Sequence, residues 1–477
     1  MTPVLFNKSK IIATIGPSSM DIDTLEKMIR AGMDVVRINA SHGDHAMHKT
    51  IIDNLHKLNS EKRYKIPVLY DLQGPKLRIG EVKDNAVELV EGSPIRLSIH
   101  PCIGTSHMLH VHYTNFYEDV QPGDPVLIDD GKIELLVIGK ETDGVVLAKV
   151  IHGGIVSSRK GINLPFTKIS LPCLSDKDCR DLEFALENGV EWIGLSFVRT
   201  ANDILELKQH ISSKGRKTRV VAKIEKPEAL RDLDNIIKAA DAIMVARGDL
   251  GVEIAMEKVP VIQKMIVRKA ISHSKPVIIA TQMMESMITN YRPTRAEASD
   301  VANAVFDGAD ALMLSGETSV GAFPIKVVEA MAKIITISET EDFIYNKQIP
   351  PIKDSRSFVS DSVCYNACLM AQQSGAAGII AMTNSGYTAF RISSQRPRSH
   401  VFIFTDNMEM LTTLNLVWGV RAFHYDRYEG SQETINDIKS FLKKKGLVKE
   451  GDLLINVYST PLEDRGMANT IKLHLIS

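Results

Sequence analysis

Short apolar segments that end in polar residues recur eight times along the chain, each followed by a loop and a helical pattern. Near-continuous apolar runs of this length are typical of strands buried on both faces of a parallel sheet. Eight such units predict an α/β fold, a (β/α)8 TIM barrel, with its active site at the carboxyl ends of the strands. The predicted strands are Ile11–Gly16, Val35–Asn39, Val68–Asp71, Trp192–Phe197, Val220–Glu225, Ile243–Arg247, Val277–Thr281 and Ala311–Ser315.

Capping signals mark helices in the segments between these strands. Asp23 is expected to cap the first helix, and Ser175 precedes a helical pattern that stops at Gly189. Thr294 and Glu297 have the T-x-x-E spacing of a capping box, in which each side chain satisfies a free backbone amide. Strand and helix signals therefore alternate as a barrel requires.

Two further regions interrupt or follow the barrel pattern. From residue 74 to residue 171, short strand-like runs alternate with Gly- and Pro-rich turns, which predicts an all-β lid domain inserted into a barrel loop. After the linker Ile349–Pro351, strands and helices alternate again, which predicts a doubly wound α/β domain. The predicted boundaries are 1–73 and 172–345 for the barrel, 74–171 for the lid and 346–477 for the C-terminal domain.

Charge and composition narrow the possible partners. The 477-residue chain has 57 Lys and Arg against 58 Asp and Glu, so its formal net charge is −1. This balance argues against a broad basic surface for nucleic acid or for a membrane, and no apolar run approaches the ~20 residues that span a bilayer. The first residues do not resemble a signal peptide, and the five cysteines form no disulfide or zinc pattern. We therefore expect a cytoplasmic protein with no nucleic-acid or membrane partner.

Polar side chains gather at the predicted strand ends, where a barrel places its chemistry. A Glu and an Asp on neighbouring strand ends are hard oxygen ligands that suit Mg²⁺ or Mn²⁺, and a Lys and an Arg add positive charge beside them. Any one of these charges would fit a structural ion pair equally well, but their convergence on one barrel face favours a site for a small substrate with carboxylate and phosphate groups. The candidates are Arg37, Asn39, Ser41, Lys223, Glu225 and Asp249.

The chain has no G-x-x-x-x-G-K-[ST] or G-x-G-x-x-G motif, so a bound nucleotide would depend on metal, Lys and Arg for its phosphates. The strand ends carry a different series of motifs: Thr14–Pro17, Asn39–Gly43, Asp71–Lys76, Lys223–Glu225, Met244–Gly251, Ala280–Gln282 with Glu285–Met287, Arg292–Glu297 and Leu314–Thr318. In this order they resemble the motifs of the pyruvate kinase family. The resemblance implies transfer of a phosphoryl group from phosphoenolpyruvate to ADP, and assembly as a homotetramer.

The resemblance also implies roles for the residues at the barrel mouth. Glu225 and Asp249 would hold the divalent ion, Lys223 would meet the phosphoryl group in flight, and Arg37 would grip phosphate. Backbone amides at Gly248 and Asp249 would bind the substrate carboxylate.

Two hydroxyls and the lid complete the implied site. Thr281 and Ser315 would position or relay the proton that reaches the enolate, through water, because a hydroxyl alone is a poor acid. Asn39 and His42, together with Arg78 and Lys160 of the lid, would contact the nucleotide, and lid closure would exclude water. Without the resemblance, Lys160 would be interpreted as a solvated charge on a turn.

One motif departs from the pattern of many pyruvate kinases, which need K⁺ held by Asn, Ser, Asp and Thr. Asn39, Ser41 and Asp71 are kept, but Leu72 and Lys76 stand where those enzymes have Thr and Glu. We predict that the Lys76 ammonium replaces the monovalent cation, as in a K⁺-independent bacterial branch with the motif Leu-Gln-Gly-Pro-Lys. The alternative is that Lys76 is an ordinary surface charge.

A second site is predicted in the C-terminal domain. The loop of Thr383, Asn384, Ser385, Gly386, Tyr387 and Thr388 follows a strand and opens a helix, a favourable place for a phosphate. The resemblance implies a phosphorylated allosteric effector there, with residues 462–466 in a later effector loop. Fructose bisphosphate, a sugar monophosphate and AMP remain open, and the alternative is an ordinary capped helix.

Other interpretations remain to be weighed. A metal-dependent aldolase or lyase would use the same carboxylates but has little use for a nucleotide lid, and a metabolite sensor on an inactive barrel predicts the loss of Lys223, Glu225 or Asp249. Histidines gather in the lid around Cys102, where a solvent-facing strand is favoured over a metal site because no supporting turn is present. These histidines are His100, His107, His110 and His112.

Overall fold

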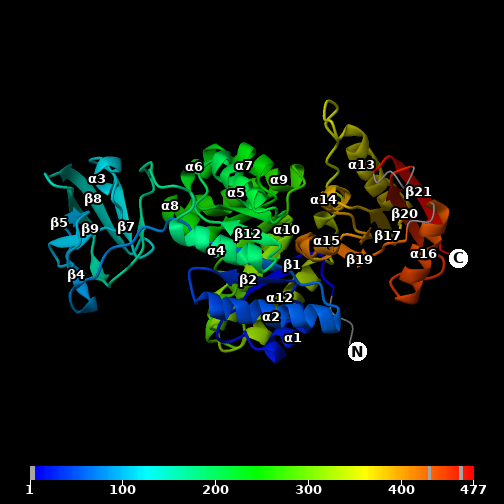
Figure 1. Ribbon diagram of the computed structural model, residues 1–477, viewed down its shortest axis with the longest axis horizontal. Coiled ribbons are helices and arrows are strands. Elements are labelled where there is room, and N and C mark those ends of the chain that lie inside the picture. The colour runs from blue at the N-terminus through cyan, green and yellow to red at the C-terminus, as the bar shows by residue number, and fades with distance from the viewer. Residues whose placement is uncertain (1–5, 428–430, 461–465, 477) are drawn as a thin grey trace.

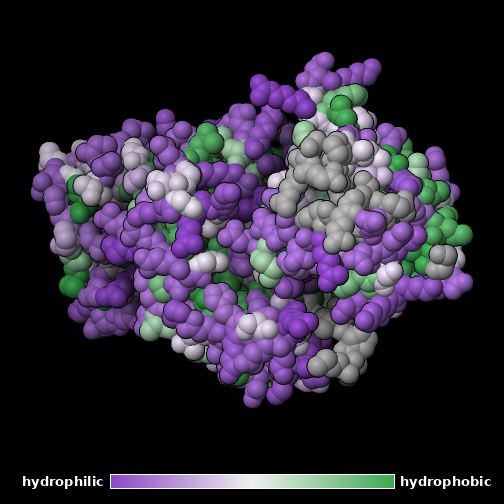
Figure 2. Space-filling model, turned by 45° about the vertical axis from the view of Figure 1, so that its right-hand side comes forward, coloured by the Kyte–Doolittle hydropathy of each residue, from purple (hydrophilic) through white to green (hydrophobic). Residues whose placement is uncertain are grey.

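The computed structural model describes residues 6–427, 431–460 and 466–476. The chain forms a central barrel with an all-β lid at one end of the molecule and a C-terminal α/β unit at the other (Figure 1). Polar residues dominate the face shown in Figure 2. No helix within the described ranges is both long and apolar enough to cross a membrane.

Eight parallel strands close into the predicted barrel, in the order β1-β16-β15-β14-β13-β12-β3-β2. Their side chains are buried on both faces, as continuous apolar runs require. The observed strands lie within two residues of the predicted ones. They are β1 (Lys10–Thr14), β2 (Val35–Asn39), β3 (Val68–Asp71), β12 (Trp192–Leu195), β13 (Arg219–Ile224), β14 (Ala242–Ala246), β15 (Val277–Ala280) and β16 (Ala311–Leu314).

The barrel interior is packed with side chains rather than open. One cluster fills it, including Ile12, Leu69, Trp192 and Met244, and Leu416 of the C-terminal unit joins this cluster. The alternate strand residues, such as Ile11 and Val36, face outward and pack against the surrounding helices in a separate cluster. Each strand therefore has little freedom to slide, which fixes the positions of the polar residues at its end.

Helices follow the strands around the barrel, and three short helices lie at the strand ends themselves. Thr294 caps its helix through the predicted capping box with Glu297, and Ser175 caps its helix through a capping box with Asp178 that was not predicted. Asp21 rather than Asp23 caps the first helix, so that expectation was wrong. Asp21 has extended backbone angles, whereas Asp23 already lies inside the first turn. The helices are α1 (Ile22–Ala31), α2 (His45–Lys62), α4 (Asp176–Glu187), α5 (Ala201–Ser213), α6 (Pro227–Arg231), α7 (Leu233–Ala239), α8 (Arg247–Glu253), α9 (Val259–Ser272), α10 (Arg295–Asp307), α11 (Gly316–Ser319) and α12 (Pro324–Ser338).

The lid lies between β3 and α4 and has an apolar core of its own. Its larger sheet has the strand order β11-β7-β8-β9-β5-β6, and β10 pairs with β4 in a second, two-stranded sheet. The lid elements are β4 (Val87–Leu89), β5 (Pro94–Ser98), β6 (Met108–His110), α3 (Phe116–Asp119), β7 (Pro125–Ile128), β8 (Ile133–Lys140), β9 (Val145–His152), β10 (Gly154–Val156) and β11 (Ile162–Asn163).

The C-terminal unit is a five-stranded sheet, β19-β18-β17-β20-β21, with an apolar cluster on each face. Four strands match the apolar runs that predict them, Gly378–Met382, Val401–Phe404, Arg421–His424 and Leu453–Val457. The antiparallel edge strand β21 (Thr470–Leu475) was not predicted, because its side chains are only partly buried. The other elements are α13 (Phe358–Ser374), β17 (Gly378–Met382), α14 (Tyr387–Ser394), β18 (His400–Thr405), α15 (Met408–Thr413), β19 (Val420–His424), α16 (Ser431–Lys444) and β20 (Leu453–Tyr458).

A buried ion pair joins this unit to the barrel. The Arg396 guanidinium donates to Asp310 Oδ2 at 2.6 Å and to the Gly308 carbonyl at 2.8 Å, and both ionic side chains are almost fully buried. Asp310 also accepts from the backbone amides of Val277 and Trp418. Because every donor comes from a different segment, this carboxylate connects two barrel strands with the C-terminal unit.

We expect Arg396→Met to lower the free energy of unfolding by about 3–5 kcal/mol, since it leaves the Asp310 charge buried without its partner. Urea unfolding followed by fluorescence reports on this junction, because the Trp418 ring lies 5.0 Å from the Arg396 guanidinium. Arg398→Met is the matched control, since Arg398 pairs with Asp342 in solvent, and should change the stability by less than about 1 kcal/mol. Equal effects of the two substitutions would contradict the prediction.

Candidate active site

The carboxyl ends of β1, β2, β3 and β13 bring four charged side chains and one hydroxyl together. The Arg37 guanidinium donates to Asp71 Oδ2 from two nitrogens, at 2.9 and 2.6 Å, and to the Thr14 hydroxyl at 2.9 Å. The Lys223 ammonium lies 3.3 Å from Asp71 Oδ1 and 3.0 Å from Glu225 Oε1. All five residues are buried, so their charges interact through little water.

The charges in this cluster shift one another's titration. Burial disfavours the charged form of Lys223, but the Asp71 and Glu225 carboxylates outweigh it and raise the pKa of the ammonium. Burial likewise disfavours the Asp71 carboxylate, yet Lys223 and Arg37 together hold its pKa below the usual value. Lys223 is therefore a fixed cation at neutral pH.

Glu225 and Asp249 are the candidate metal ligands. Burial raises the pKa of Glu225, Lys223 opposes this shift, and the Asp249 charge adds to it. Glu225 Oε2 also accepts from the Phe197 backbone amide at 2.7 Å, which fixes the plane of the carboxylate. Asp249 lies half-buried in the first turn of α8.

The donor set at this point fits Mg²⁺ or Mn²⁺. Two carboxylates are the usual protein contribution to such an ion, which takes its remaining ligands from substrate phosphate and water. The described part of the chain contains no group of three or more His, Cys, Asp and Glu that would form an all-protein cage. The site therefore suits an ion that is completed by a substrate.

Thr281 and Gly248 contact each other directly. The Gly248 amide donates to the Thr281 hydroxyl at 2.8 Å, and the hydroxyl donates to the Ala280 carbonyl at 2.7 Å. Thr281 and Gln282 both have positive φ, 69° and 54°. This conformation is rare for a β-branched residue such as Thr281 and stores strain of about 1–3 kcal/mol. The backbone thus turns sharply where β15 ends, and this turn brings Thr281 to α8.

Ser315 lies at the end of the neighbouring strand, β16, and its backbone amide donates to Glu317 Oε2 at 2.6 Å. Buried Glu317 also accepts from the Met284 amide at 3.1 Å, so one carboxylate holds the loops after β15 and β16 together. Arg247, the first residue of α8, holds this helix to its neighbours through hydrogen bonds to Asp300 and to the Thr281 carbonyl. Glu317 and Arg247 were not assigned a role from the sequence, although both lie inside the quoted motifs.

Ser196 is a further residue that the sequence reasoning missed. Its hydroxyl accepts from the Lys223 ammonium at 2.7 Å and donates to the Leu72 carbonyl at 2.7 Å. The available signal was the polar residue at the end of the fourth predicted strand, which is the pattern that identified Lys223 and Glu225. Ser196 gives Lys223 a neutral partner between the two carboxylates.

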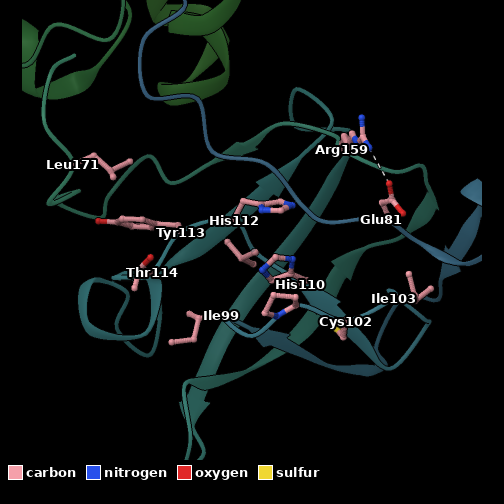
Figure 3. Close-up of a pocket in the computed structure, with 12 residues that line it drawn as sticks. Glu81, Ile99, Cys102, Ile103, His110, His112, Tyr113, Thr114, Arg159 and Leu171 are labelled. Carbon is pink, nitrogen blue, oxygen red and sulfur yellow. Dashed lines mark hydrogen bonds and ion pairs between the residues drawn. The ribbon is translucent and has the colours of Figure 1, made fainter. Parts of the chain in front are cut away.

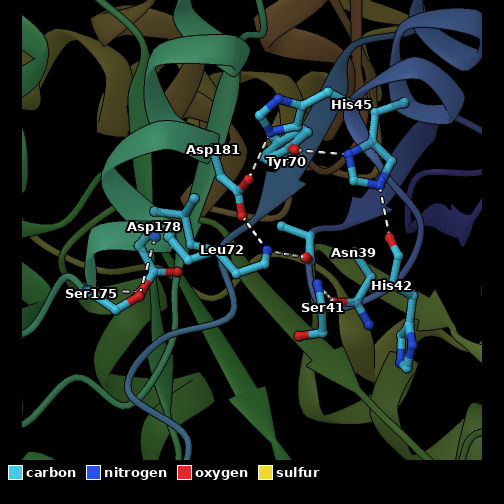
Figure 4. A network of polar contacts seen from close by, with 12 residues as sticks. Asn39, Ser41, His42, His45, Tyr70, Leu72, Ser175, Asp178 and Asp181 are labelled. Atoms are coloured by element: carbon cyan, nitrogen blue, oxygen red, sulfur yellow. Dashed lines mark hydrogen bonds and ion pairs between the residues drawn. The ribbon is translucent and has the colours of Figure 1, made fainter.

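The loop after β2 holds Asn39, Ser41 and His42, and a separate polar network supports it (Figure 4). Asn39 Oδ1 accepts from the Ser41 amide at 3.1 Å. The Lys177 ammonium of α4 donates to the Ala40 carbonyl at 2.6 Å, and buried His48 contacts the His42 carbonyl at 2.8 Å. The backbone of this loop is therefore fixed from two sides, while the His42 side chain is exposed.

The network continues beneath this loop. Lys177 donates to Asp181 at 2.5 Å, and Asp181 also contacts the His45 ring at 2.8 Å (Figure 4). His48 contacts the Tyr70 hydroxyl on β3 at 2.8 Å. Burial lowers the pKa of His48, which favours the neutral ring.

The lid side chains are held mostly by other lid residues. The Lys160 ammonium pairs with Asp129 at 2.8 Å, and this contact lowers the pKa of the carboxyl. The Arg78 guanidinium donates to the Arg159 carbonyl at 3.0 Å. Lys76 is half-buried, and its side chain packs against the backbone of Gly161, next to Lys160.

The predicted effector loop lines a cavity of about 650 Å³ in the C-terminal unit. The Thr383 hydroxyl accepts from the Gly386 amide at 3.0 Å, and Gly386 has a φ of 84° that suits glycine. Ser385 Oγ accepts from the Tyr387 amide at 3.4 Å, Asn384 donates to Asp406 at 3.2 Å, and Thr388 lies at the start of α14. In the later loop, residues 461–465 lie outside the described part of the chain.

A cavity of about 960 Å³ lies in the lid, away from the charged strand ends (Figure 3). His110 and His112 line it, with ring centroids 4.3 Å apart, and Cys102 and Tyr113 lie on its wall. Burial lowers the pKa of His110, so this ring favours its neutral form.

Comparisons with known proteins cover almost the whole chain. Two family descriptions match it, "Pyruvate kinase, barrel domain" over residues 6–328 and "Pyruvate kinase, alpha/beta domain" over residues 361–474. The chain is 40% identical to the pyruvate kinase of Corynebacterium glutamicum over 469 residues, which is 98% of both chains. It is 38% identical to the pyruvate kinase of Geobacillus stearothermophilus, covering 98% of this chain and 80% of that one.

A solved structure supports the same conclusion. The crystal structure of a pyruvate kinase from Cryptosporidium parvum matches 99% of this chain and 96% of its own, with a TM-score of 0.92 and 34% sequence identity. Barrel, lid and C-terminal unit therefore have the same arrangement in both. The chain belongs to the pyruvate kinase family, phosphotransferases that convert phosphoenolpyruvate into pyruvate.

Proposed function

We propose that this chain transfers the phosphoryl group of phosphoenolpyruvate to ADP, giving pyruvate and ATP, at the charged strand ends of the barrel. The observation that carries the proposal is Lys223, a buried cation held between Asp71 and Glu225. A phosphoryl group in transfer spreads negative charge over its oxygens, and a preorganised cation stabilises that charge without reorganising water.

Each charged residue at the strand ends has one task in this proposal. Arg37 grips the phosphate of the substrate, and its two hydrogen bonds to Asp71 keep the guanidinium plane fixed. Glu225 and Asp249 would hold Mg²⁺ or Mn²⁺, which supplies positive charge shared by the substrate carboxylate and phosphate. Lys223 lies two residues before Glu225 on the same strand, so it faces the phosphoryl group from the side of the metal.

Loss of the phosphoryl group leaves an enolate that must be protonated on carbon. Thr281 and Ser315 lie on adjacent strand ends, where they would order a water molecule that delivers the proton. The Gly248 amide now donates to Thr281. When the substrate carboxylate binds, the amides of Gly248 and Asp249 would turn to it, which frees the Thr281 hydroxyl.

The nucleotide would bind between the barrel and the lid. Asn39 and His42 would contact the nucleotide from the barrel, and Arg78 and Lys160 from the lid. Before the nucleotide binds, the ion pair with Asp129 at 2.8 Å keeps the Lys160 ammonium ordered. In the proposed closed state, Lys160 leaves Asp129 and binds the phosphates of ADP. A closed lid protects the phosphoryl group from water.

We infer that K⁺ is not required. In the inferred arrangement Lys76 supplies a unit positive charge near Asn39, Ser41 and Asp71, and the Thr that would hold K⁺ is replaced by Leu72. The Lys76 ammonium would also bring this charge close to the lid, since its side chain packs on Gly161.

We further propose that a phosphorylated metabolite activates the enzyme by binding at residues Thr383–Thr388. Two arginine contacts would carry the signal to the barrel. Arg219, the first residue of β13, donates to the Ser385 carbonyl at 3.0 Å, and this strand carries Lys223 near its other end. Arg391 of α14 donates to Ser274, shortly before β15 and Thr281.

The proposed organisation has three domains with boundaries at 1–73 with 172–345, 74–171 and 346–477, in a cytoplasmic homotetramer. The edge strand β21 supports the assembly, because Leu473 and Leu475 expose apolar side chains at the end of the C-terminal sheet.

Two rival functions give different results in one assay. An aldolase or lyase with the same carboxylates does not need ADP. A sensor without activity would have no use for Lys223, Glu225 and Asp249, all of which the barrel brings together.

In an assay that follows pyruvate formation from phosphoenolpyruvate, we expect activity only when ADP and Mg²⁺ are both present. Lys223→Met should lower kcat by at least about a hundredfold, because it removes the charge that meets the transferred group. Lys217→Met, at an exposed lysine just before β13, is the matched control and should retain full activity. Pyruvate formation without ADP, or a fully active Lys223→Met enzyme, would refute the assignment.

Removal of K⁺ should change kcat/KM by less than about twofold, because the ammonium supplies the same unit charge. Lys76→Glu, which restores the carboxylate of the K⁺-requiring enzymes, should make activity depend on added K⁺. Lys83→Glu, an equal charge reversal at an exposed lid residue, should not. A strong K⁺ requirement of the unmodified enzyme would overturn the inference.

Fructose bisphosphate, glucose 6-phosphate and AMP can each be tested as effectors by thermal shift and by activation at low phosphoenolpyruvate. At least one should raise the melting temperature, and Thr383→Ala combined with Ser385→Ala should abolish that rise by removing two hydroxyls from the loop. A shift that survives in the double variant would place the effector elsewhere, and no shift with any of the three would count against activation by these ligands.

A further inference from the structure

A buried polar triad lies where the lid joins the barrel. The Lys226 ammonium pairs with Glu253 Oε1 at 2.5 Å, and the Asn163 side-chain amide donates to the same oxygen at 2.8 Å. The Lys226 and Glu253 side chains are only 8% and 0% exposed, and Asn163 is buried as well. Burying charged groups away from water costs free energy, which only good hydrogen-bond geometry offsets. Loss of one partner is therefore strongly destabilising.

The three members come from the three segments that the proposed reaction needs to coordinate. Lys226 directly follows Glu225, Glu253 ends the helix α8 that carries Asp249, and Asn163 belongs to the lid strand β11. Asp249 and Glu253 are four residues apart in α8 and therefore lie on one face of it. The ion pair thus connects the two elements that carry the candidate metal ligands.

A second contact joins this triad to Glu225. The Lys226 ammonium lies 5.9 Å from the centre of the Phe197 ring, and the Phe197 amide donates to Glu225 Oε2. Phe197 has a φ of 55°, a conformation that a bulky residue adopts only when its surroundings impose it. Lys226 therefore contacts Phe197, which orients the Glu225 carboxylate, and also directly follows Glu225 in the chain.

Glu253 uses only one of its two oxygens. Both donors reach Oε1, whereas Oε2 is buried and accepts no hydrogen bond from the described residues. The lid contact of Asn163 and the barrel contact of Lys226 therefore depend on the same atom. Glu253 is therefore the point at which the lid and the metal ligands are connected.

We propose that Lys226, Glu253 and Asn163 are positioning residues: the ion pair sets the separation of Glu225 and Asp249, and Asn163 ties the nucleotide-binding edge of the lid to that pair. Lys160 lies three residues before Asn163, so this contact limits how far the proposed nucleotide contact moves from the metal. The inference rests on the metal and lid roles proposed above.

The first test separates the lid contact from the ion pair. Asn163→Ala leaves Lys226 and Glu253 paired, and it should raise the KM for ADP about tenfold, the effect of losing one hydrogen bond to a charged group. The KM for phosphoenolpyruvate should change less than about twofold. Thr167→Ala is the matched control, because Thr167 is a buried lid residue whose hydroxyl bonds only within the lid, to Asp124. If both variants shift the KM for ADP equally, the lid contact has no positioning role.

The second test measures metal binding without turnover. Mn²⁺ binding to the protein alone, followed by electron paramagnetic resonance, should weaken about tenfold in Glu253→Gln and in Lys226→Met, but not in Asn163→Ala. Lys226→Arg keeps the charge and should recover most of the affinity. A merely structural pair would lower the melting temperature of these variants and leave the Mn²⁺ affinity of the folded protein unchanged, which would overturn the proposal.

The two tests remain informative if some variants do not fold or if the reaction assignment fails. Should Lys226→Met and Glu253→Gln be insoluble, Asn163→Ala still decides through the KM for ADP, because it retains both buried charges. Pyruvate formation by the unmodified enzyme is measured first on the same preparation, so loss of the reaction assignment is distinguished from loss of the positioning role. An unchanged KM for ADP in Asn163→Ala, or unchanged Mn²⁺ affinity in folded Lys226→Met and Glu253→Gln, would refute the inference.

Discussion

Charge balance in a dry barrel mouth is the constraint on which the site depends. Arg37 and Lys223 are buried cations. Asp71 compensates the charge of Arg37, and Asp71 and Glu225 together compensate that of Lys223. The low exposure that makes these charges costly also makes them effective on a phosphoryl group, because water does not screen them. The closed ring of parallel strands is what holds four such residues at fixed separations.

Buried carboxylates that accept several hydrogen bonds also join the parts of the molecule. Asp310 accepts from Arg396 and from two backbone amides, and in this way joins the barrel to the C-terminal unit. Glu317 connects the loops after β15 and β16, and Glu253 at the end of α8 connects Asn163 of the lid with Lys226, which follows β13. In each case one buried carboxylate gathers donors from separate segments, so a local movement at one segment is felt by the others.

Prediction from sequence succeeded where local pattern and local geometry coincide. All eight barrel strands were located because apolar runs such as Val277–Ala280 are buried on both faces, and Lys223 and Glu225 stood out because a period of two puts them on one side of a strand. Prediction from sequence failed where a strand is only partly buried, and where two nearby residues could each cap a helix. Strand β21 is half exposed at a sheet edge. Asp21 caps the first helix because its backbone is extended, whereas Asp23, two residues later, already lies in the first turn.

The amino-acid sequence alone determined the fold class, the family resemblance and the strand ends that carry chemistry, because these follow from periodicity and from short motifs. Only the tertiary structure revealed which charges compensate one another: that Ser196 lies against Lys223, that Thr281 accepts from Gly248, and that Asn163 reaches Glu253 across 90 residues of chain. Such pairings depend on distances between segments remote in sequence, and a buried charge is stable only when its partner is in place.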